Sequence, residues 1–180
     1  MYTSYTDVLF NQYSAHRIGL ITLQSENVNK YKYKNECDCE YACDDCSVEF
    51  VCDVTNKTDD VLCVTNRDLI SSNPEIVCSG ATATIVKLGR GESLKFKGIA
   101  CKHRGNEHAK FSPVTIVRCV YNVDKDAPVQ VRHVQSTDPR EFEFEIETTS
   151  AMKAKTALNL ALDFMIKKIS QFSDSLDLIA

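Results

Sequence analysis

Four cysteines crowd into ten residues of the chain: Cys37, Cys39, Cys43 and Cys46. The spacing C-x-C-x3-C-x2-C allows all four sulfurs to reach one ion at about 2.3 Å in a tetrahedron, and Zn2+ prefers this ligand set. A shell closed by four thiolates is typical of a structural zinc, because a catalytic zinc keeps one position open for water. The pattern therefore predicts one structural zinc ion. The alternatives are four free thiols in an acidic loop or an iron–sulfur cluster.

The other five cysteines stand singly along the chain. Residues 1–10 lack the basic and apolar segments of a secretory signal, so we expect an intracellular protein, in which disulfides are rare. The odd count of nine cysteines also argues against a disulfide framework. Most of the five are therefore expected to be small buried hydrophobes. They are Cys52, Cys63, Cys78, Cys101 and Cys119.

A catalytic site would need a nucleophile and a base, and the four histidines are scattered along the chain. No serine or cysteine lies in a nucleophile motif, and the carboxylates have no motif context. The run Gly89-Arg90-Gly91 is expected to be a tight turn, because a phosphate-binding loop needs more glycines and a following helix. The sequence thus favours a non-catalytic protein over the alternative of a small hydrolase.

The composition is that of a globular protein of one large or two small domains: 180 residues, 43% hydrophobic and 26% charged. No apolar run approaches the roughly 20 residues that a membrane span needs. The formal net charge of −4 argues against a surface that binds nucleic acid by itself, since such surfaces cluster Lys and Arg. Any role in nucleic-acid chemistry is therefore expected to be indirect.

The elements that must position the cysteines are mostly strands. Alternating or β-branched runs, separated by Gly, Asn, Asp and Pro, predict a mostly antiparallel sheet domain. The expected strands are residues 47–54, 61–65, 84–88, 93–101, 114–121 and 141–148. Residues 25–45 show no sustained period and are expected to form a loop ordered by a metal rather than by a core. A turn is predicted at 56–60 and a connection at 124–140.

Two helices are predicted, one near each end of the chain. A short helix within residues 6–23 is expected to start at Thr6 or Asp7 and to end near Gly19. A long helix is expected after Ser150 as N-cap, with apolar residues at spacings of three and four. Its apolar stripe contains Ala157, Leu158, Ala161, Leu162, Met165, Ile169 and Phe172. The strand before it offers one apolar face, Phe142, Phe144 and Ile146, so part of the stripe is expected to bind another chain.

Two further segments, AHRIGLI at 15–21 and GNEHAKF at 105–111, mix charged and apolar residues without a period. Contact surfaces between chains often have this composition. We therefore interpret His16, Arg17, Glu107, His108 and Lys110 as interface residues. The alternative is a hydrogen-bonded core histidine in each segment.

Three motifs in this order resemble one known family. The run around Ala15-His16-Arg17-Ile18-Gly19-Leu20-Ile21 is similar to its AHRLGLIP signature, with Thr22 in place of proline. The cysteine pattern matches its zinc loop, and residues 107–111 are similar to its EHAKW segment, with Phe111 in place of tryptophan. A weaker match is VTNRDL at 64–69, similar to V-x-S-[RK]-D-L. The family is the third-largest subunit of eukaryotic RNA polymerase II, with the archaeal D subunit and the bacterial alpha subunit as counterparts.

The resemblance implies an α+β fold in which an alpha-subunit-like dimerisation domain, residues 1–23 and 131–180, is interrupted by an inserted β domain, residues 24–130, with the zinc loop. The family normally has a further stretch before Thr6, so the N-terminal part of the dimerisation domain is expected to be incomplete.

Further expectations from the resemblance are a non-catalytic assembly role, a nuclear location and three kinds of partner. The partners are a small alpha-like subunit, the second-largest catalytic subunit and small zinc-binding subunits. The helix residues expected at the alpha-like partner are Leu158, Leu162, Met165 and Ile169. A viral version, in a virion or a cytoplasmic viral factory, and a free-standing zinc-binding adaptor are the alternatives.

Overall fold

Strand β1 (Ser47–Thr55) is the central strand of the larger sheet in the computed structural model, which describes residues 11–121 and 142–177. It pairs antiparallel with β5 (Ser93–Cys101) along its whole length and with the two-residue β3 (Ile70–Ser71) on its other side. Its side chains alternate, so that Val48, Phe50 and Cys52 are buried while Val51 and Asp53 face solvent. This alternation is the pattern expected of a strand with one buried face.

A second sheet packs against the buried face of the first. It consists of β2 (Leu62–Thr65) and β4 (Thr84–Leu88), again antiparallel. One core cluster joins Cys52 of β1 to buried residues of these strands, namely Val64, Ile85, Val86 and Leu88. A second cluster, Val48, Phe50 and Ile76, extends this core toward the cysteine loop and receives Leu23 and Tyr31 from the segment that precedes the cysteines. Two sheets that share one apolar interior hold the first half of the chain together.

Helix α1 (Asn11–Gly19) lies on this body beside β4, and short 3-10 turns follow it along the chain. The turns are η1 (Val28–Lys30), η2 (Lys34–Glu36) and η3 (Asn66–Asp68), and a fourth, η4 (Ala109–Phe111), follows β5. Residues 25–45 contain no strand or α-helix apart from η1 and η2, as the sequence predicts for a loop.

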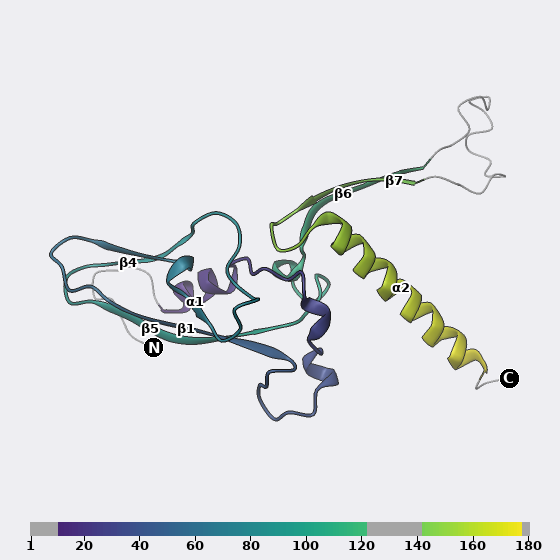
Figure 1. The fold of residues 1–180 in the computed structure, drawn as a ribbon, viewed down its shortest axis with the longest axis horizontal. Helices are drawn as coiled ribbons and strands as arrows, with labels where there is room; N and C mark the ends of the chain where they lie inside the picture. Colours follow the sequence, from purple (N-terminus) through teal and green to yellow (C-terminus); the bar gives the residue numbers. More distant parts are fainter. Residues whose placement is uncertain (1–10, 122–141, 178–180) are drawn as a thin grey trace.

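The third sheet and the long helix form the other side of the molecule (Figure 1). Strand β6 (Val114–Tyr121) pairs antiparallel with β7 (Phe142–Thr148), and α2 (Ala154–Asp177) follows β7. In Figure 1 the body with β1, β4, β5 and α1 lies to the left, whereas α2 runs away from β6 and β7 as a separate arm. Most side chains of α2 beyond Leu160 are exposed, so the arm is not packed into the core.

All six predicted strands are present, each with bounds within one residue of those predicted. All strand pairs are antiparallel, which confirms the predicted sheet type. The short N-terminal helix ends at Gly19 as predicted, while its predicted N-caps, Thr6 and Asp7, lie outside the described residues. The connection at 124–140 and His133 also lie outside them.

The start of α2 corrects the sequence prediction. Ser150 is not its N-cap, because the helix begins four residues later and Ser150 has a φ of 67°, in the left-handed region that few non-glycine residues adopt. The carboxylate of Glu26, far away in sequence, accepts hydrogen bonds from the Lys153 backbone N–H at 2.5 Å and from Thr156 Oγ1 at 2.8 Å. These bonds hold the pKa of Glu26 below its ordinary value, with the Thr156 bond as the main cause. A side chain from the cysteine-loop side thus stabilises the helix start.

The motif VTNRDL forms a corner between β2 and β3. Thr65 Oγ1 accepts a hydrogen bond from the Arg67 backbone N–H, and Asp68 accepts one from the Thr65 backbone N–H at 2.7 Å, which together form a capping box. Asn66 is buried, and its side-chain oxygen accepts a bond from the backbone N–H of Ala83 at 3.0 Å. This stretch therefore has a structural role.

Asn56 is the most constrained polar side chain of the body. It is 1% exposed; its amide nitrogen donates to the backbone oxygens of Asp60 and Leu88 at 2.7 and 2.9 Å, and its oxygen accepts from Thr58. We expect Asn56→Ala to lower the free energy of unfolding by about 2–3 kcal/mol, since the buried Leu88 carbonyl and the partly buried Asp60 carbonyl would lose their donors. Urea unfolding of the zinc-loaded protein measures it, with the exposed Asn29→Ala as control. An equal effect of the two substitutions would contradict the prediction.

The prediction that most single cysteines are buried is wrong. Cys52 alone among the five is fully buried; Cys78 and Cys101 are half-buried, and Cys63 and Cys119 are exposed. The exposure of Cys63 follows from strand geometry, because its neighbour Val64 faces the core and adjacent side chains point to opposite faces. No helix among the described residues is long and apolar enough to cross a membrane.

Candidate functional site

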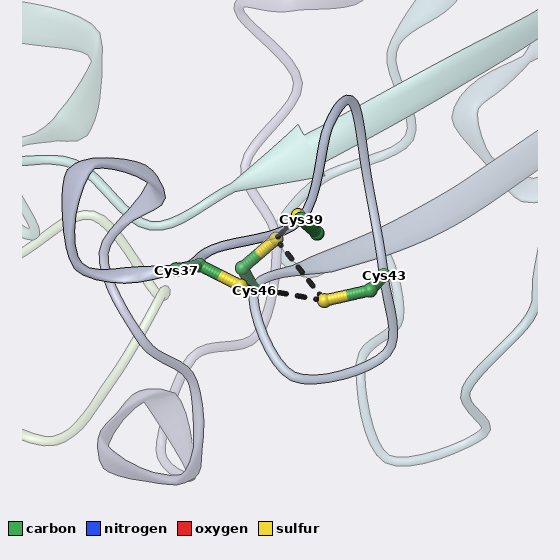
Figure 2. Close-up of side chains that lie close together, drawn as sticks. All are labelled: Cys37, Cys39, Cys43 and Cys46. Atoms are coloured by element: carbon green, nitrogen blue, oxygen red, sulfur yellow. Dashed lines mark hydrogen bonds between the residues drawn. The ribbon is translucent and has the colours of Figure 1, made fainter.

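The four predicted metal ligands converge on one point. Figure 2 shows Cys37, Cys39, Cys43 and Cys46 with their side chains turned toward one another at the base of the loop. Their Sγ atoms all lie within 4.8 Å of one another. The Cys37–Cys43 and Cys39–Cys46 sulfur pairs are 3.5 Å apart, and the Cys43–Cys46 pair is 3.6 Å apart.

This geometry fits a tetrahedral metal. Four sulfurs at about 2.3 Å from a central ion lie about 3.8 Å from one another, close to the observed separations. Thiolate ligands in a closed shell suit Zn2+, whose role in such a site is to fix the loop rather than to carry out chemistry. The four cysteines therefore could hold one metal ion, as the sequence predicts.

The loop is attached to the sheet at its last cysteine. Cys46 is fully buried and directly precedes β1, so the first strand fixes one ligand in place. The backbone oxygen of Cys43 accepts bonds from the Cys46 backbone N–H at 3.1 Å and from Ser47 Oγ at 2.9 Å. On the other side, the Lys32 backbone N–H donates to the Asp45 oxygen at 2.8 Å, which closes the base of the loop.

Lys34 contacts the cysteine cluster, and the sequence reasoning missed it. Its ammonium lies 3.1 Å from Cys39 Sγ and donates to the Cys39 backbone oxygen at 3.0 Å. This contact lowers the pKa of the Cys39 thiol to about 7, whereas the neighbouring Cys37 thiol raises the pKa of Cys43 to about 12. Without a metal Cys39 and Cys43 therefore do not ionise together, and a metal must displace the proton of Cys43. The lysine-to-sulfur contact was not visible in the spacing.

The ammonium of Lys34 would also offset negative charge at a bound metal. Zn2+ with four thiolates has a net charge of about −2, and the exposed carboxylates of the loop make its surroundings still more negative. We expect Lys34→Met to weaken zinc affinity by about tenfold, within the range of outer-shell substitutions. Competition with a chelator of known affinity measures it, and Lys57→Met, an exposed lysine in the 56–60 turn, is the control. Unchanged affinity in Lys34→Met would show that the contact does not tune the site.

The two predicted interface segments meet in space. The Nζ atom of Lys110 lies 3.8 Å from the point where a Cβ on Gly19, the last residue of α1, would sit. His16 and Arg17 occupy the last turn of the same helix and are exposed. Arg17 donates to the backbone oxygen of Thr84 at 2.6 Å, which ties α1 to β4. The segments 15–21 and 105–111 thus lie next to each other at Gly19 and Lys110.

In the second segment, 105–111, hydrogen bonds and an ion pair hold the polar side chains in place. Glu107 pairs with His103 at 2.5 Å, and this bond is the main cause that lowers the pKa of Glu107. His108 Nδ1 accepts from the Lys110 backbone N–H at 3.0 Å and so caps η4. The His103 ring lies 4.7 Å from that of Phe111, centroid to centroid. Neither His16 nor His108 is a buried core histidine.

The predicted partner face of α2 is exposed in this chain. Leu158 is half-buried, but Leu162, Met165 and Ile169 are 46%, 57% and 65% exposed. Phe144 on β7 is also 41% exposed, so the sheet face does not cover the stripe. The helix touches the body through Phe164 instead, which lies on Arg104 and points about 200° round the helix from Leu162.

The comparisons with known proteins agree with this geometry. Residues 8–124, more than half of the chain, match the family model described as "RNA polymerase Rpb3/RpoA insert domain". The chain is 39% identical over 121 residues to "DNA-directed RNA polymerase II subunit rpb3" of Dictyostelium discoideum, covering 62% of this chain and 40% of the relative. It is 37% identical over 135 residues to "DNA-directed RNA polymerases II, IV and V subunit 3" of Arabidopsis thaliana, covering 66% and 42%.

An archaeal protein, "DNA-directed RNA polymerase subunit Rpo3" of Methanosphaera stadtmanae, is 34% identical over 108 residues, covering 59% of this chain and 40% of the relative. The chain therefore spans about two fifths of the length of these curated relatives. The α+β fold with antiparallel sheets and a four-cysteine loop is the one predicted from the resemblance. The match over the body of the chain shows that it belongs to the RNA polymerase Rpb3/RpoA insert domain family and is Rpb3-like.

Proposed function

We propose that this chain is a non-catalytic assembly subunit of a multi-subunit DNA-directed RNA polymerase. The observation that carries the proposal is the family match over residues 8–124, together with relatives that are named as RNA polymerase subunits. In this role the protein binds other polymerase chains and contacts nucleic acid only indirectly, in keeping with its net charge of −4.

The cysteine loop is proposed to hold one structural Zn2+. The converging sulfurs and the Lys34 contact support this assignment. The ion would be held by Cys37, Cys39, Cys43 and Cys46, and it would fix a loop that otherwise has few apolar residues. A fixed loop presents a defined surface to another chain, whereas a loose one would lose conformational entropy on binding.

The stripe of α2 is proposed as the contact with a small alpha-like subunit. The exposure of these side chains supports the proposal, because a row of large exposed apolar side chains on one face of a long helix is unusual on an isolated protein. Helices of this kind bind by placing apolar residues at spacings of three and four against another helix. The division into a dimerisation domain, 1–23 and 131–180, and an inserted domain, 24–130, stays part of this proposal.

The joined surface of α1 and η4 is proposed as the contact with the second-largest subunit or the small zinc-binding subunits. It is composed of His16, Arg17, Glu107, His108 and Lys110. Its support is that two segments distant in sequence converge on one exposed patch. The patch mixes charge with an aromatic ring, Phe111, as polar interfaces often do.

A substitution in this surface separates assembly from catalysis. We expect Glu107→Ala with His108→Ala to lower the yield of assembled polymerase several-fold, because the variant loses the His103 pair and the cap of η4. Nucleotide addition per assembled enzyme should stay normal. Reconstitution followed by a transcription assay on the purified complex measures both quantities, with Lys57→Ala as control. A fully assembled enzyme without activity would contradict a structural role.

A nuclear location is proposed from the relatives named as RNA polymerase II subunits. The alternative of a virion or viral factory has no support among the relatives compared. Affinity purification of the tagged chain, with mass-spectrometric identification of the co-purifying chains, tests the function. The proposal predicts the two largest polymerase subunits and an alpha-like chain in near-equal amounts. A monodisperse zinc protein without polymerase chains would instead indicate the free-standing adaptor.

A further inference from the structure

A basic cluster lies where the stem of the cysteine loop, the segment after β5 and the middle of α2 meet. We define it by four cations and two aromatic rings: Lys102, Arg104, Lys167, Lys168, Tyr33 and Phe164. Three stretches of chain that are distant in sequence contribute to it. The cluster is separate from the cysteine ligands and from the Leu162 face of α2.

Arg104 is the centre of the cluster and is held between the two rings. Its Cζ atom lies 4.1 Å from the Tyr33 ring centroid and 4.7 Å from the Phe164 ring centroid. Its Nε donates to the Tyr33 hydroxyl at 3.2 Å. The rings fix the guanidinium through cation–π contact and leave its terminal nitrogens as donors. A group bound by Arg104 therefore meets a side chain that is already ordered.

The lysines add charge around Arg104. Lys102 lies 4.6 Å above the Tyr33 ring and donates to the Tyr31 backbone oxygen at 3.0 Å, while Lys168 lies 5.8 Å from the Phe164 ring. Burial, with repulsion from Arg104 and Lys167, lowers the pKa of Lys102, and only the charge of Glu36 acts in the opposite direction.

The four cations have no ion-pair partner among the described residues. Seven ion pairs join described residues, and none of them includes Lys102, Arg104, Lys167 or Lys168. Such a concentration of positive charge is a local exception on a protein of net charge −4. The charges of Glu36 and Glu107 act on Lys102 and Arg104, but neither carboxylate forms an ion pair with them, so the cluster can still bind anions of another molecule.

We propose that this basic cluster docks an acidic peptide segment, rich in Asp and Glu, of another chain in the same complex. A carboxylate matches the free edge of a clamped guanidinium through paired hydrogen bonds. Nucleic acid suits the site less well, because a phosphate backbone is bound by cations spread along a surface, whereas these four lie around one guanidinium on a protein of net charge −4. The inference rests on the proposed function only in taking that chain to be a polymerase subunit.

Zero-length carbodiimide cross-linking tests the inference in the complex that co-purifies with the tagged chain. This reagent joins lysines to carboxylates that are in ion-pair contact. The pairs Lys30–Glu75 and Lys95–Asp53 are internal positive controls. We expect cross-links from Lys102, Lys167 or Lys168 to Asp or Glu residues of another chain.

Three results would overturn the inference. The first is the absence of such cross-links when the control pairs react. The second is cross-links from the cluster only to this chain's own carboxylates, with Glu36 as the nearest candidate. The third is an ultraviolet cross-link between the cluster and nucleic acid. If acidic cross-links lead to a chain that is not a polymerase subunit, the docking site stands and the proposed function fails.

Charge reversal gives a second readout. Lys167→Glu with Lys168→Glu should reduce the remaining Lys102 cross-links at least five-fold and lower the salt concentration at which the acidic chain dissociates. The matched control is Lys57→Glu with Lys87→Glu, two exposed lysines of the body. Lys167→Arg with Lys168→Arg keeps the charge and should retain the partner. Loss of the partner in the arginine variant, or its full retention in the glutamate variant, would contradict a charge-based site.

Discussion

Replacing Leu162 and Met165 by aspartate is expected to dissociate this chain from its alpha-like partner. Both side chains are about half exposed on α2 in the single chain, so the variant should fold. In the proposed heterodimer each aspartate would bury an unpaired charge, at a cost of several kcal/mol by the burial of ionised groups. A micromolar to nanomolar complex is held by about 8–12 kcal/mol, so two such costs suffice to break it.

Co-expression followed by size-exclusion chromatography measures this effect. The matched control, Ser170→Asp with Gln171→Asp, adds the same charge at exposed positions of α2 that lie off the Leu162 stripe. The control should elute with the partner at wild-type stoichiometry. If the Leu162 and Met165 variant folds and also elutes with the partner, the stripe does not form the contact, and α2 has another role.

Replacing all four loop cysteines by serine is the second large change. We expect zinc to fall from close to one ion per chain to none, because serine oxygens do not replace thiolates in a tetrahedral site. The two core clusters around β1, β2 and β4 should persist, since their buried residues include none of the four loop cysteines. The loop at 35–47 should lose its order, because its contacts converge on the sulfurs.

Metal analysis of the pure protein measures the loss of zinc, and hydrogen exchange across the chain measures the loss of order in the loop. Fast exchange should appear at 35–47 and protection should remain in β1 and β5. The control is Cys63→Ser with Cys119→Ser, which changes two exposed thiols that lie outside the cluster. Unchanged zinc content in the four-serine variant would mean that the metal binds elsewhere.

The sequence predicted the strands well because each has one buried face. Strands β4, β5 and β6 have the predicted bounds, and the alternation of Val48, Phe50 and Cys52 in β1 marks the core side directly. Strand β3 was not predicted, because two residues are too few to show a period. The cysteine cluster was predicted from spacing alone, since four thiols within ten residues can converge whatever the surrounding fold is.

Features that depend on long-range contacts were not predictable. The start of α2 depends on Glu26, more than a hundred residues earlier, and no local pattern at Ser150 reveals it. The Lys34–Cys39 contact needs the folded loop, and the clamp of Arg104 between Tyr33 and Phe164 needs three distant segments. Cys119 is exposed because β6 belongs to a two-stranded sheet, a property of the topology rather than of the strand itself.

Native mass spectrometry of a purified, transcriptionally active polymerase tests the central claim most directly. The enzyme is isolated through a tag on its second-largest subunit, so that this chain is not the bait. The assembly role predicts one copy of this chain for each copy of the tagged subunit, with mass added by one loop-bound zinc. An active polymerase that contains this chain in only trace amounts, or not at all, would contradict it.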